Sequence, residues 1–447
     1  MSGAASARPQ VARATAGGMR LLVVRDATFP IVHFSFTFRP GALADPAHAP
    51  GAVSMALPWI LRGTQRASRA EFYEALERLG STLDTSVSHE MATIHGASLS
   101  QHLPATLALL EEALREPRLE AEALADLCEE ARQGLIGERD DDDALAEVFL
   151  REAFFEATPL ARSPMGSAGA LAALAPADVD AARRLLAADA CTAAFAGDVE
   201  LEQAAAMARR VAAALPGRAP APLVTPALPE HRHARPRLVL VDKPDRSQAQ
   251  IRLALPGLDA RHPELDPFWL GVVAFGGTFT SPLTREVRDK RGWSYVAHAD
   301  FRRRSLYPSP VVLRTAPAIA DAIDCTALQL DMLGALQRGA LEADSLERAR
   351  DYLLGRAPFW TATAFDLLGP AVALELLGLP EERLWDTEAR LEAIDLRAVP
   401  ALMARAFAGL SPVVVIVGSK ERLEGPLRKA FADLPLVVRP YTDGLEP

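Results

Sequence analysis

The sequence predicts an α+β fold built from two homologous halves, each a mostly antiparallel sheet covered by helices. The main support is an internal duplication, in which three short stretches recur in the same order some 220 residues later. The recurring pairs are Arg20–Val24 with Arg237–Val241, Leu119–Leu124 with Leu341–Leu346, and Thr192–Gly197 with Val413–Gly418. So long a period is typical of a duplicated domain, since solenoid repeats are far shorter. A second support is the proline-rich segment 216–236, which has no periodic apolar face and is expected to be a semi-rigid linker.

Each half is expected to run through the same order of elements, from a β-rich opening to a closing strand and helix. The first half should contain strands within 21–39, an apolar helix at 49–61, a return to strand after Gly80, helices at 103–115 and 119–136, a strand at 192–196 and a helix at 201–215. The second half should contain strands within 238–255, an apolar helix at 267–275, a strand at 294–301, and a closing strand and helix at 413–417 and 423–434. The predicted domains are a disordered tail (1–18), an N-terminal domain (19–215), the linker (216–236) and a C-terminal domain (237–447).

Composition excludes several classes of protein. The chain has 447 residues, a net charge of −10 and a pI of about 5.5, whereas a nucleic-acid binder usually carries a basic excess. Its three cysteines are far apart and odd in number, so no disulfide framework is expected. No apolar run reaches the ~18 residues of a membrane helix, so no membrane insertion is expected. No secretory signal is present in the sequence, which predicts a cytoplasmic location, or a periplasmic one if a signal was removed.

One segment of the first half carries the frame of a metal motif without its ligands. The frame runs from Gly51 to Arg62-Gly63-Thr64. Together with the duplicated halves, it resembles the pitrilysin/insulinase (M16) family of zinc peptidases, in the branch of chains of about this size. In that family the first helix carries His-x-x-Glu-His, whose histidines bind Zn²⁺ and whose glutamate is the general base.

The three motif positions fall here on Ser54, Leu57 and Pro58, and the family's further glutamate ligand falls on Glu138. A hydroxyl is a poor zinc ligand, and leucine and proline offer no ligand at all. The resemblance therefore implies a degenerate metal site, with no metal and no cofactor in this chain.

A second motif, Gly276–Tyr295, closely resembles the family's other signature. In that signature an Arg and a Tyr seven residues apart, here Arg288 and Tyr295, approach the zinc from the opposite half of a clamshell dimer. Guanidinium and phenol groups donate hydrogen bonds to the oxygen that becomes negative during amide hydrolysis. The resemblance therefore assigns substrate and transition-state binding to Arg288 and Tyr295, acting on the site of another chain.

Other motifs have simpler interpretations. His89 and His95 share one strand face beside Glu90, but no further metal ligand is indicated. The acidic run Asp140–Asp143 lacks the spacing of a calcium loop and is expected to be an exposed helix end or turn. The run Arg302–Arg304 could attract acidic peptide segments, although an exposed loop is the simpler interpretation. After Gly80 an edge strand is expected, without the family's usual Asn-Ala pair that helps to hold a peptide.

The resemblance implies a chain that is inactive alone and acts as the non-catalytic subunit of a heterodimeric zinc peptidase. Its partner would be a subunit of similar size that carries His-x-x-Glu-His and the zinc. The substrate would be an unfolded peptide or a peptide precursor, as in the maturation of the pyrroloquinoline quinone peptide. The alternatives are a structural or assembly subunit, a homodimeric peptide-binding protein, and an independently active enzyme with a rearranged metal site.

Overall fold

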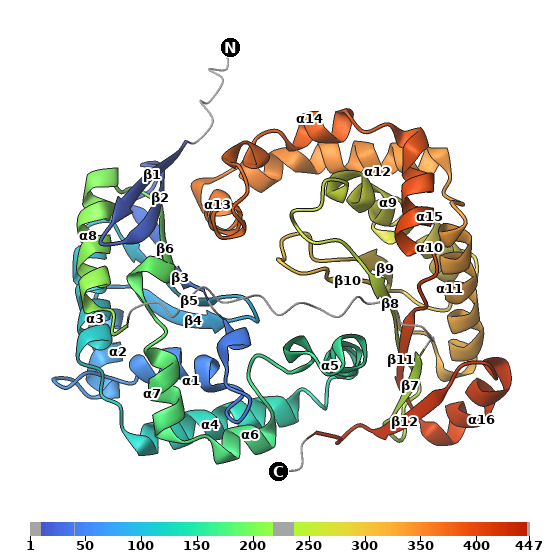
Figure 1. The fold of residues 1–447 in the computed structure, drawn as a ribbon, viewed down its shortest axis with the longest axis horizontal. Coiled ribbons are helices and arrows are strands. Elements are labelled where there is room, and N and C mark those ends of the chain that lie inside the picture. The colour runs from blue at the N-terminus through green and yellow to red at the C-terminus, as the bar shows by residue number, and fades with distance from the viewer. Residues whose placement is uncertain (1–9, 40, 218–236, 445–447) are drawn as a thin grey trace.

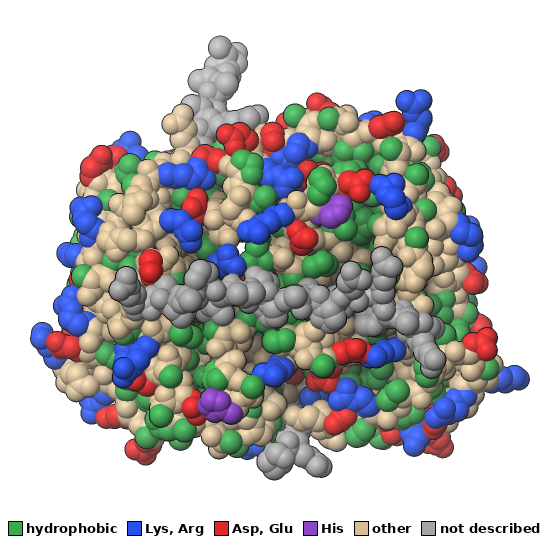
Figure 2. Space-filling model, in the orientation of Figure 1, with side chains coloured by type: hydrophobic (Ala, Val, Ile, Leu, Met, Phe, Trp, Pro, Cys, Tyr) green, Lys and Arg blue, Asp and Glu red, His purple; other side chains and the backbone are tan. Residues whose placement is uncertain are grey.

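A computed structural model of the chain describes residues 10–39, 41–217 and 237–444. Its architecture is α+β, with two six-stranded sheets, one in each half, and most helices on their outer sides (Figure 1). This confirms the predicted fold class and the internal duplication. Basic and acidic side chains are interspersed over the face shown in Figure 2.

The first sheet has the strand order β1-β2-β6-β3-β5-β4. These strands are β1 (Val11–Ala16), β2 (Met19–Arg25), β6 (Cys191–Gly197), β3 (Ile31–Phe38), β5 (Ala92–Leu99) and β4 (Thr82–Val87). The strands β2 and β6 pair in parallel, and the other neighbours pair antiparallel. The first-half helices are α1 (Ala52–Ile60), α2 (Arg69–Arg78), α3 (Leu103–Arg115), α4 (Ala121–Gly137), α5 (Asp142–Phe155), α6 (Ala168–Ala173), α7 (Pro176–Arg183) and α8 (Leu201–Ala214). One apolar core joins the sheet to α1, α3 and α8.

The second sheet repeats this topology in the order β12-β7-β11-β8-β10-β9. These strands are β12 (Leu436–Pro440), β7 (Arg237–Asp242), β11 (Val413–Gly418), β8 (Gln250–Pro256), β10 (Pro310–Thr315) and β9 (Ala297–Asp300). The second-half helices are α9 (Leu265–Gly276), α10 (Pro282–Thr284), α11 (Ala322–Gln337), α12 (Ala343–Arg356), α13 (Ala364–Leu377), α14 (Thr387–Glu392), α15 (Val399–Phe407) and α16 (Lys420–Ala430). The halves differ at one edge strand. In the chain, β1 comes before the other strands of its sheet, whereas β12 comes after the other strands of its sheet.

One helix from each half packs on the sheet of the other half (Figure 1). The first-half helix α5 packs on β7, β8 and β11, where Phe149 and Leu145 meet Val413 and Val415. The second-half helix α13 packs on β2 and β6, with Leu367 against that sheet. Since both inner sheet faces are covered by the opposite half, the two halves interlock.

The acidic run ahead of α5 joins the halves electrostatically. Asp141 caps the helix, its carboxylate accepting from the amides of Asp143 and Ala144, as expected for a helix end. The carboxylates of Asp142 and Asp143 pair with Lys243 and Arg252 of the second half. The interpretation of the run as merely exposed is therefore incomplete, because Lys243 and Arg252 are only 4% and 1% exposed.

The predicted disordered tail (1–18) is wrong for residues 11–18. Residues 11–16 form β1, which pairs antiparallel with β2. Gly17 and Gly18, both with positive φ (61° and 88°), make the tight turn between these strands. The apolar alternation of β1 is weak, but its register with β2 supplies the backbone hydrogen bonds. Most of the predicted linker, residues 218–236, lies outside the described residues, as do 1–9.

Among the described residues no single helix is long and apolar enough to cross a membrane. The bent pair 343–361 and 364–377 reaches that length and composition only jointly, with an angle of 101° between its parts.

Candidate functional site

The positions at which the resemblance expects a metal motif lie on α1, which packs in the core of the first half. Ser54 is 3% exposed, and its hydroxyl donates to the carbonyl oxygen of Pro164 at 2.6 Å. Leu57 is fully buried in the apolar core. Pro58 lies within the helix, where it has no N–H to donate. Each residue therefore has a packing or hydrogen-bonding role, and this set of side chains does not fit a zinc ion.

The N-terminus of α1 is sealed by close backbone contacts. The Asp45 carboxylate accepts from the amides of Gly51 (2.7 Å) and Val53 (2.8 Å). Burial raises the pKa of Asp45 to about 6. A Cβ on Gly51 would lie 2.5 Å from the carbonyl oxygen of Met165, and one on Gly166 would lie 2.5 Å from that of Pro50. The loop 163–167 thus packs directly on the start of the helix that carries the metal motif in the family.

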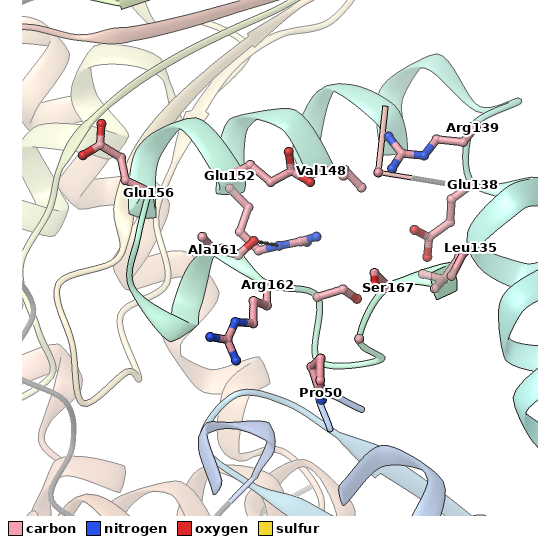
Figure 3. A pocket seen from close by; sticks show the side chains of 15 residues that line it. Pro50, Leu135, Glu138, Arg139, Val148, Glu152, Glu156, Ala161, Arg162 and Ser167 are labelled. Carbon is pink, nitrogen blue, oxygen red and sulfur yellow. Dashed lines mark hydrogen bonds between the residues drawn. The ribbon is translucent and has the colours of Figure 1, made fainter. Parts of the chain in front are cut away.

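Glu138 lies at the C-terminal end of α4 and is exposed. It lines a cavity of about 500 Å³, together with Pro50 and Ser167 (Figure 3). Within the described residues, no three His, Cys, Asp or Glu side chains are grouped closely enough to hold a metal ion. The His89 ring nitrogen instead contacts the carbonyl oxygen of Arg162 at 2.9 Å, and Glu90 accepts from the amide of Leu306 at 2.7 Å.

Arg288 and Tyr295 lie in the second half, in a segment with aromatic side chains exposed to solvent. After α10 the chain makes a π-helical turn, Arg285–Asp289. The Arg288 guanidinium lies over the Phe279 ring, 4.9 Å from its centroid, and its Nε donates to Asp289 at 3.0 Å. Tyr295 is 81% exposed and Phe279 is 70% exposed. Phenol and guanidinium groups can each donate hydrogen bonds to carbonyl oxygens of a bound peptide.

Local contacts fix this segment from beneath. The Thr284 hydroxyl lies 2.9 Å from the carbonyl oxygens of both Thr278 and Ala297, so it ties the helical turn to β9. Ser294 is buried, and its hydroxyl accepts from the amide of Ala316 at 2.8 Å. The predicted strand at 294–301 is therefore too long, because β9 begins at Ala297 and Tyr295 precedes it on a loop.

The structure does not bring the two groups of predicted residues together. Leu57 belongs to the apolar core of the first half, whereas Val287, next to Arg288, belongs to that of the second half. Figure 1 shows α1 and α10 on opposite sides of the molecule. Any site that uses Arg288 and Tyr295 together with a metal must take that metal from outside α1.

Two contributions were missed by the sequence analysis. Phe279 lies inside the second motif, and its ring is 70% exposed and carries the guanidinium of Arg288. Asp45 caps α1, and an acidic residue shortly before a helix start was the available signal. The expected edge strand after Gly80 is β4, which lies at the outer edge of its sheet. Such an edge can pair with an extended peptide.

Two models of known protein families match this chain. A model described as insulinase (peptidase family M16) matches residues 20–168, and one described as peptidase M16 inactive domain matches residues 180–353. The two models together cover well over half of the chain. A search of proteins with curated functions gave no match.

Several solved structures share the fold. The peptidase M16 inactive domain from Pseudomonas fluorescens has a TM-score of 0.81 and 25% identity, covering 92% of this chain and 98% of that one. A protease from Helicobacter pylori has a TM-score of 0.78 and 14% identity, covering 92% and 100%. The periplasmic protease PqqL from Escherichia coli has a TM-score of 0.77 and 15% identity, covering 97% of this chain but 49% of PqqL.

Proposed function

Since this chain belongs to the insulinase (peptidase M16) family but carries Ser54, Leu57 and Pro58 at the metal-motif positions, we propose that it is the non-catalytic, substrate-binding subunit of a heterodimeric zinc peptidase. The observation that carries this proposal is the contrast between two surfaces. The motif positions are buried or half-buried, whereas Tyr295 is 81% exposed and the Arg288 guanidinium lies over the 70%-exposed ring of Phe279.

The partner is a chain of similar size that holds the zinc. This chain matches about half of PqqL, so a protease of this fold can contain roughly two lengths of such a chain. A pair of separate chains would reproduce that size.

In the assembled pair, Arg288 and Tyr295 face the partner's zinc and donate hydrogen bonds to the substrate carbonyl oxygen as it becomes negative. The Phe279 ring holds the guanidinium in place by a cation–π contact and supplies apolar surface for a peptide side chain. The exposed edge of β4 adds an extended peptide by backbone pairing. The substrate is an unfolded peptide or a peptide precursor, for which the precursor of pyrroloquinoline quinone is one example.

The test is to isolate the tagged chain from its native cell with its associated proteins and to identify them by mass spectrometry. We expect a protein of similar size that carries His-x-x-Glu-His. The purified pair should cleave unfolded peptides, and neither chain should do so alone. Recovery of the chain by itself, or within a large membrane complex, would contradict the proposal and favour a binding or structural role.

Point variants of the purified pair test the shared site. Tyr295→Phe and Arg288→Ala should each lower kcat/KM by about 10²–10³, because each removes a donor to the transition state. The pair should remain intact by gel filtration. The matched control is Tyr352→Phe, which alters another partly exposed tyrosine (43%) on α12 and should leave kcat/KM unchanged. Equal rates in Tyr295→Phe and in the control would remove Tyr295 from the site.

A further inference from the structure

A cavity of about 500 Å³ lies between the end of α4, helix α5 and the loop 161–168 (Figure 3). We call it the α4–α5 cavity. Its volume is in the range of small-molecule sites. Its wall combines apolar groups, including Leu135, Val148 and Ala161, with charged side chains of both signs. The question is which of these charges lack partners within the protein.

Arg139 is the clearest case. The residue is 8% exposed, and its Nη1 atom has no hydrogen-bond partner among the described residues. Figure 3 shows its guanidinium directed into the cavity. Its backbone is fixed, because Lys243 Nζ donates to the carbonyl oxygens of Arg139 (2.6 Å) and Asp140 (3.0 Å). The guanidinium also lies over the Phe149 ring, 5.3 Å from its centroid, and is attracted by Glu152 and Glu138, so the unmet need is an acceptor for Nη1. A buried donor without an acceptor is costly, and an anionic ligand group would remove that cost.

A second guanidinium is only partly used. Arg151 Nε donates to the carbonyl oxygen of Ala161 at 3.4 Å, the bond drawn as a dashed line in Figure 3. In the described part of the chain its other guanidinium nitrogens have no hydrogen bond or ion pair. Burial lowers the pKa of both Arg139 and Arg151, but arginine stays protonated at neutral pH. Two cationic groups are therefore available in one cavity.

One carboxylate of the cavity is also available. Glu152 pairs with Arg439 at 2.8 Å, and Glu156 pairs with Arg237. Glu138 lines the same cavity and attracts the charges of Arg139 and Arg151, but among the described residues it makes no direct hydrogen bond or ion pair. Figure 3 places its carboxylate facing the cavity, on the side of α4. The cavity thus offers cationic donors for a carboxylate, an acceptor for an ammonium group, and an apolar wall.

We propose that the α4–α5 cavity binds a zwitterionic ligand of dipeptide size, with its carboxylate on Arg139 and Arg151, its ammonium group on Glu138, and an apolar side chain against Leu135 and Val148. Guanidinium groups suit carboxylates because their planar N–H groups match the two oxygens. The site belongs to the lone chain and does not depend on the proposed zinc-bearing partner.

The test uses the purified chain and isothermal titration calorimetry with the dipeptide alanyl-leucine as the probe. We expect saturable binding at one site. The C-terminal amide of the same dipeptide should bind about 10- to 100-fold more weakly, because it lacks the carboxylate. The N-acetylated dipeptide should also bind more weakly, through loss of the ammonium group. Absence of binding at millimolar dipeptide, or equal affinity for the dipeptide and its amide, would overturn the proposal.

Variants then locate the site. Arg139→Gln should weaken dipeptide binding about 10- to 100-fold. Glu138→Gln should weaken the dipeptide but leave the acetylated form unchanged. Arg397→Gln is the control and should leave dipeptide binding unchanged, because Arg397 is 94% exposed and is not part of the cavity wall. Circular dichroism checks that each variant is folded. If Arg139→Gln binds the dipeptide as tightly as the unchanged chain does, the cavity is not the binding site. If a variant does not fold, the comparison of the dipeptide with its C-terminal amide still tests the proposal, because it uses the unchanged chain.

Discussion

The two exchanged helices attach the halves to each other by different means. Helix α5 combines apolar packing with pairing to a buried cation, because Arg252 is 1% exposed and pairs with Asp143 and Glu147. Helix α13 relies on apolar packing, and its charged contacts are looser, with Glu375 lying 3.6 Å from both Arg13 and Arg20. A repeated topology therefore does not require repeated energetics. Breaking a pair that includes a buried charge lowers the free energy of unfolding substantially, whereas breaking a surface pair changes it little.

The regions around the first helix of each half have also diverged. In the first half, α1 is closed off by Asp45 and by the loop 163–167. In the second half, the segment after α9 leaves Phe279 and Tyr295 at the surface. The start of α1 is thus packed against other segments of its half, whereas the segment after α9 presents side chains outward. Three predictions test these contrasts.

The largest effect is expected for Arg252→Met. This change removes the buried guanidinium that donates to Asp143 and Glu147. Because Asp143 is 66% exposed and Glu147 keeps Arg314, the cost stays below that of a fully buried pair, at about 3 kcal/mol for two charge-assisted hydrogen bonds. We expect that loss in the free energy of unfolding, measured with urea. The control is Arg246→Met, since Arg246 is partly exposed and lies 3.7 Å from Asp142. A loss below about 1 kcal/mol for Arg252→Met would mean that α5 is held mainly by its apolar face.

An intermediate effect is expected from pH. The pKa of Asp45 is about 6 in the folded chain and about 3.8 when unfolded, so the folded state keeps its proton longer. Stability from this group is therefore greatest below pH 4 and falls as pH rises to 6, by about 3 kcal/mol. Asp45→Asn removes this titration. The difference in unfolding free energy between the variant and the unchanged chain should shift by about 2 kcal/mol between pH 4 and pH 7, because at pH 4 the unfolded Asp45 is already more than half ionised. A difference independent of pH would show that Asp45 titrates normally.

The smallest effect is expected for Glu375→Gln. Its partners are partly exposed, with side-chain exposures of 33% for Arg13 and 44% for Arg20. Pairs of this kind contribute about 0–1 kcal/mol and are screened by salt. The unfolding free energy should therefore change by about 1 kcal/mol or less, and by less still in 1 M NaCl. A loss as large as that of Arg252→Met would erase the contrast between the two helices.

The sequence was most informative where a pattern is local or repeated. The helix predicted at 103–115 matches α3, and the recurring strands 20–24 and 237–241 became β2 and β7. The failures had nonlocal causes. The strand β1 depends on its pairing with β2, and β9 starts late because Ser294 bonds to the distant amide of Ala316. Propensity within a short window cannot register such partners.

The candidate site divides in the same way. The spacing of Arg288 and Tyr295 was visible in the chain, but Phe279 as their exposed neighbour was not, because burial depends on how α9 and β9 pack. The acidic run 140–143 showed its charge but not its partners, which lie about 100 residues later on another strand. The open cavity beside Arg139 could not be predicted, since it arises where three separate segments fail to fill space.

The helix exchange has a consequence for how the chain is made. The first sheet is complete once residue 197 has been synthesised, but its inner face waits for α13, more than 160 residues later. Until then Leu22, Val24 and neighbouring apolar groups lack their cover. A ribosome-bound first half would therefore expose an apolar sheet face that is prone to aggregate, and chaperones bind intermediates of this kind. Final closure of both halves must come late, as one cooperative event near the end of translation.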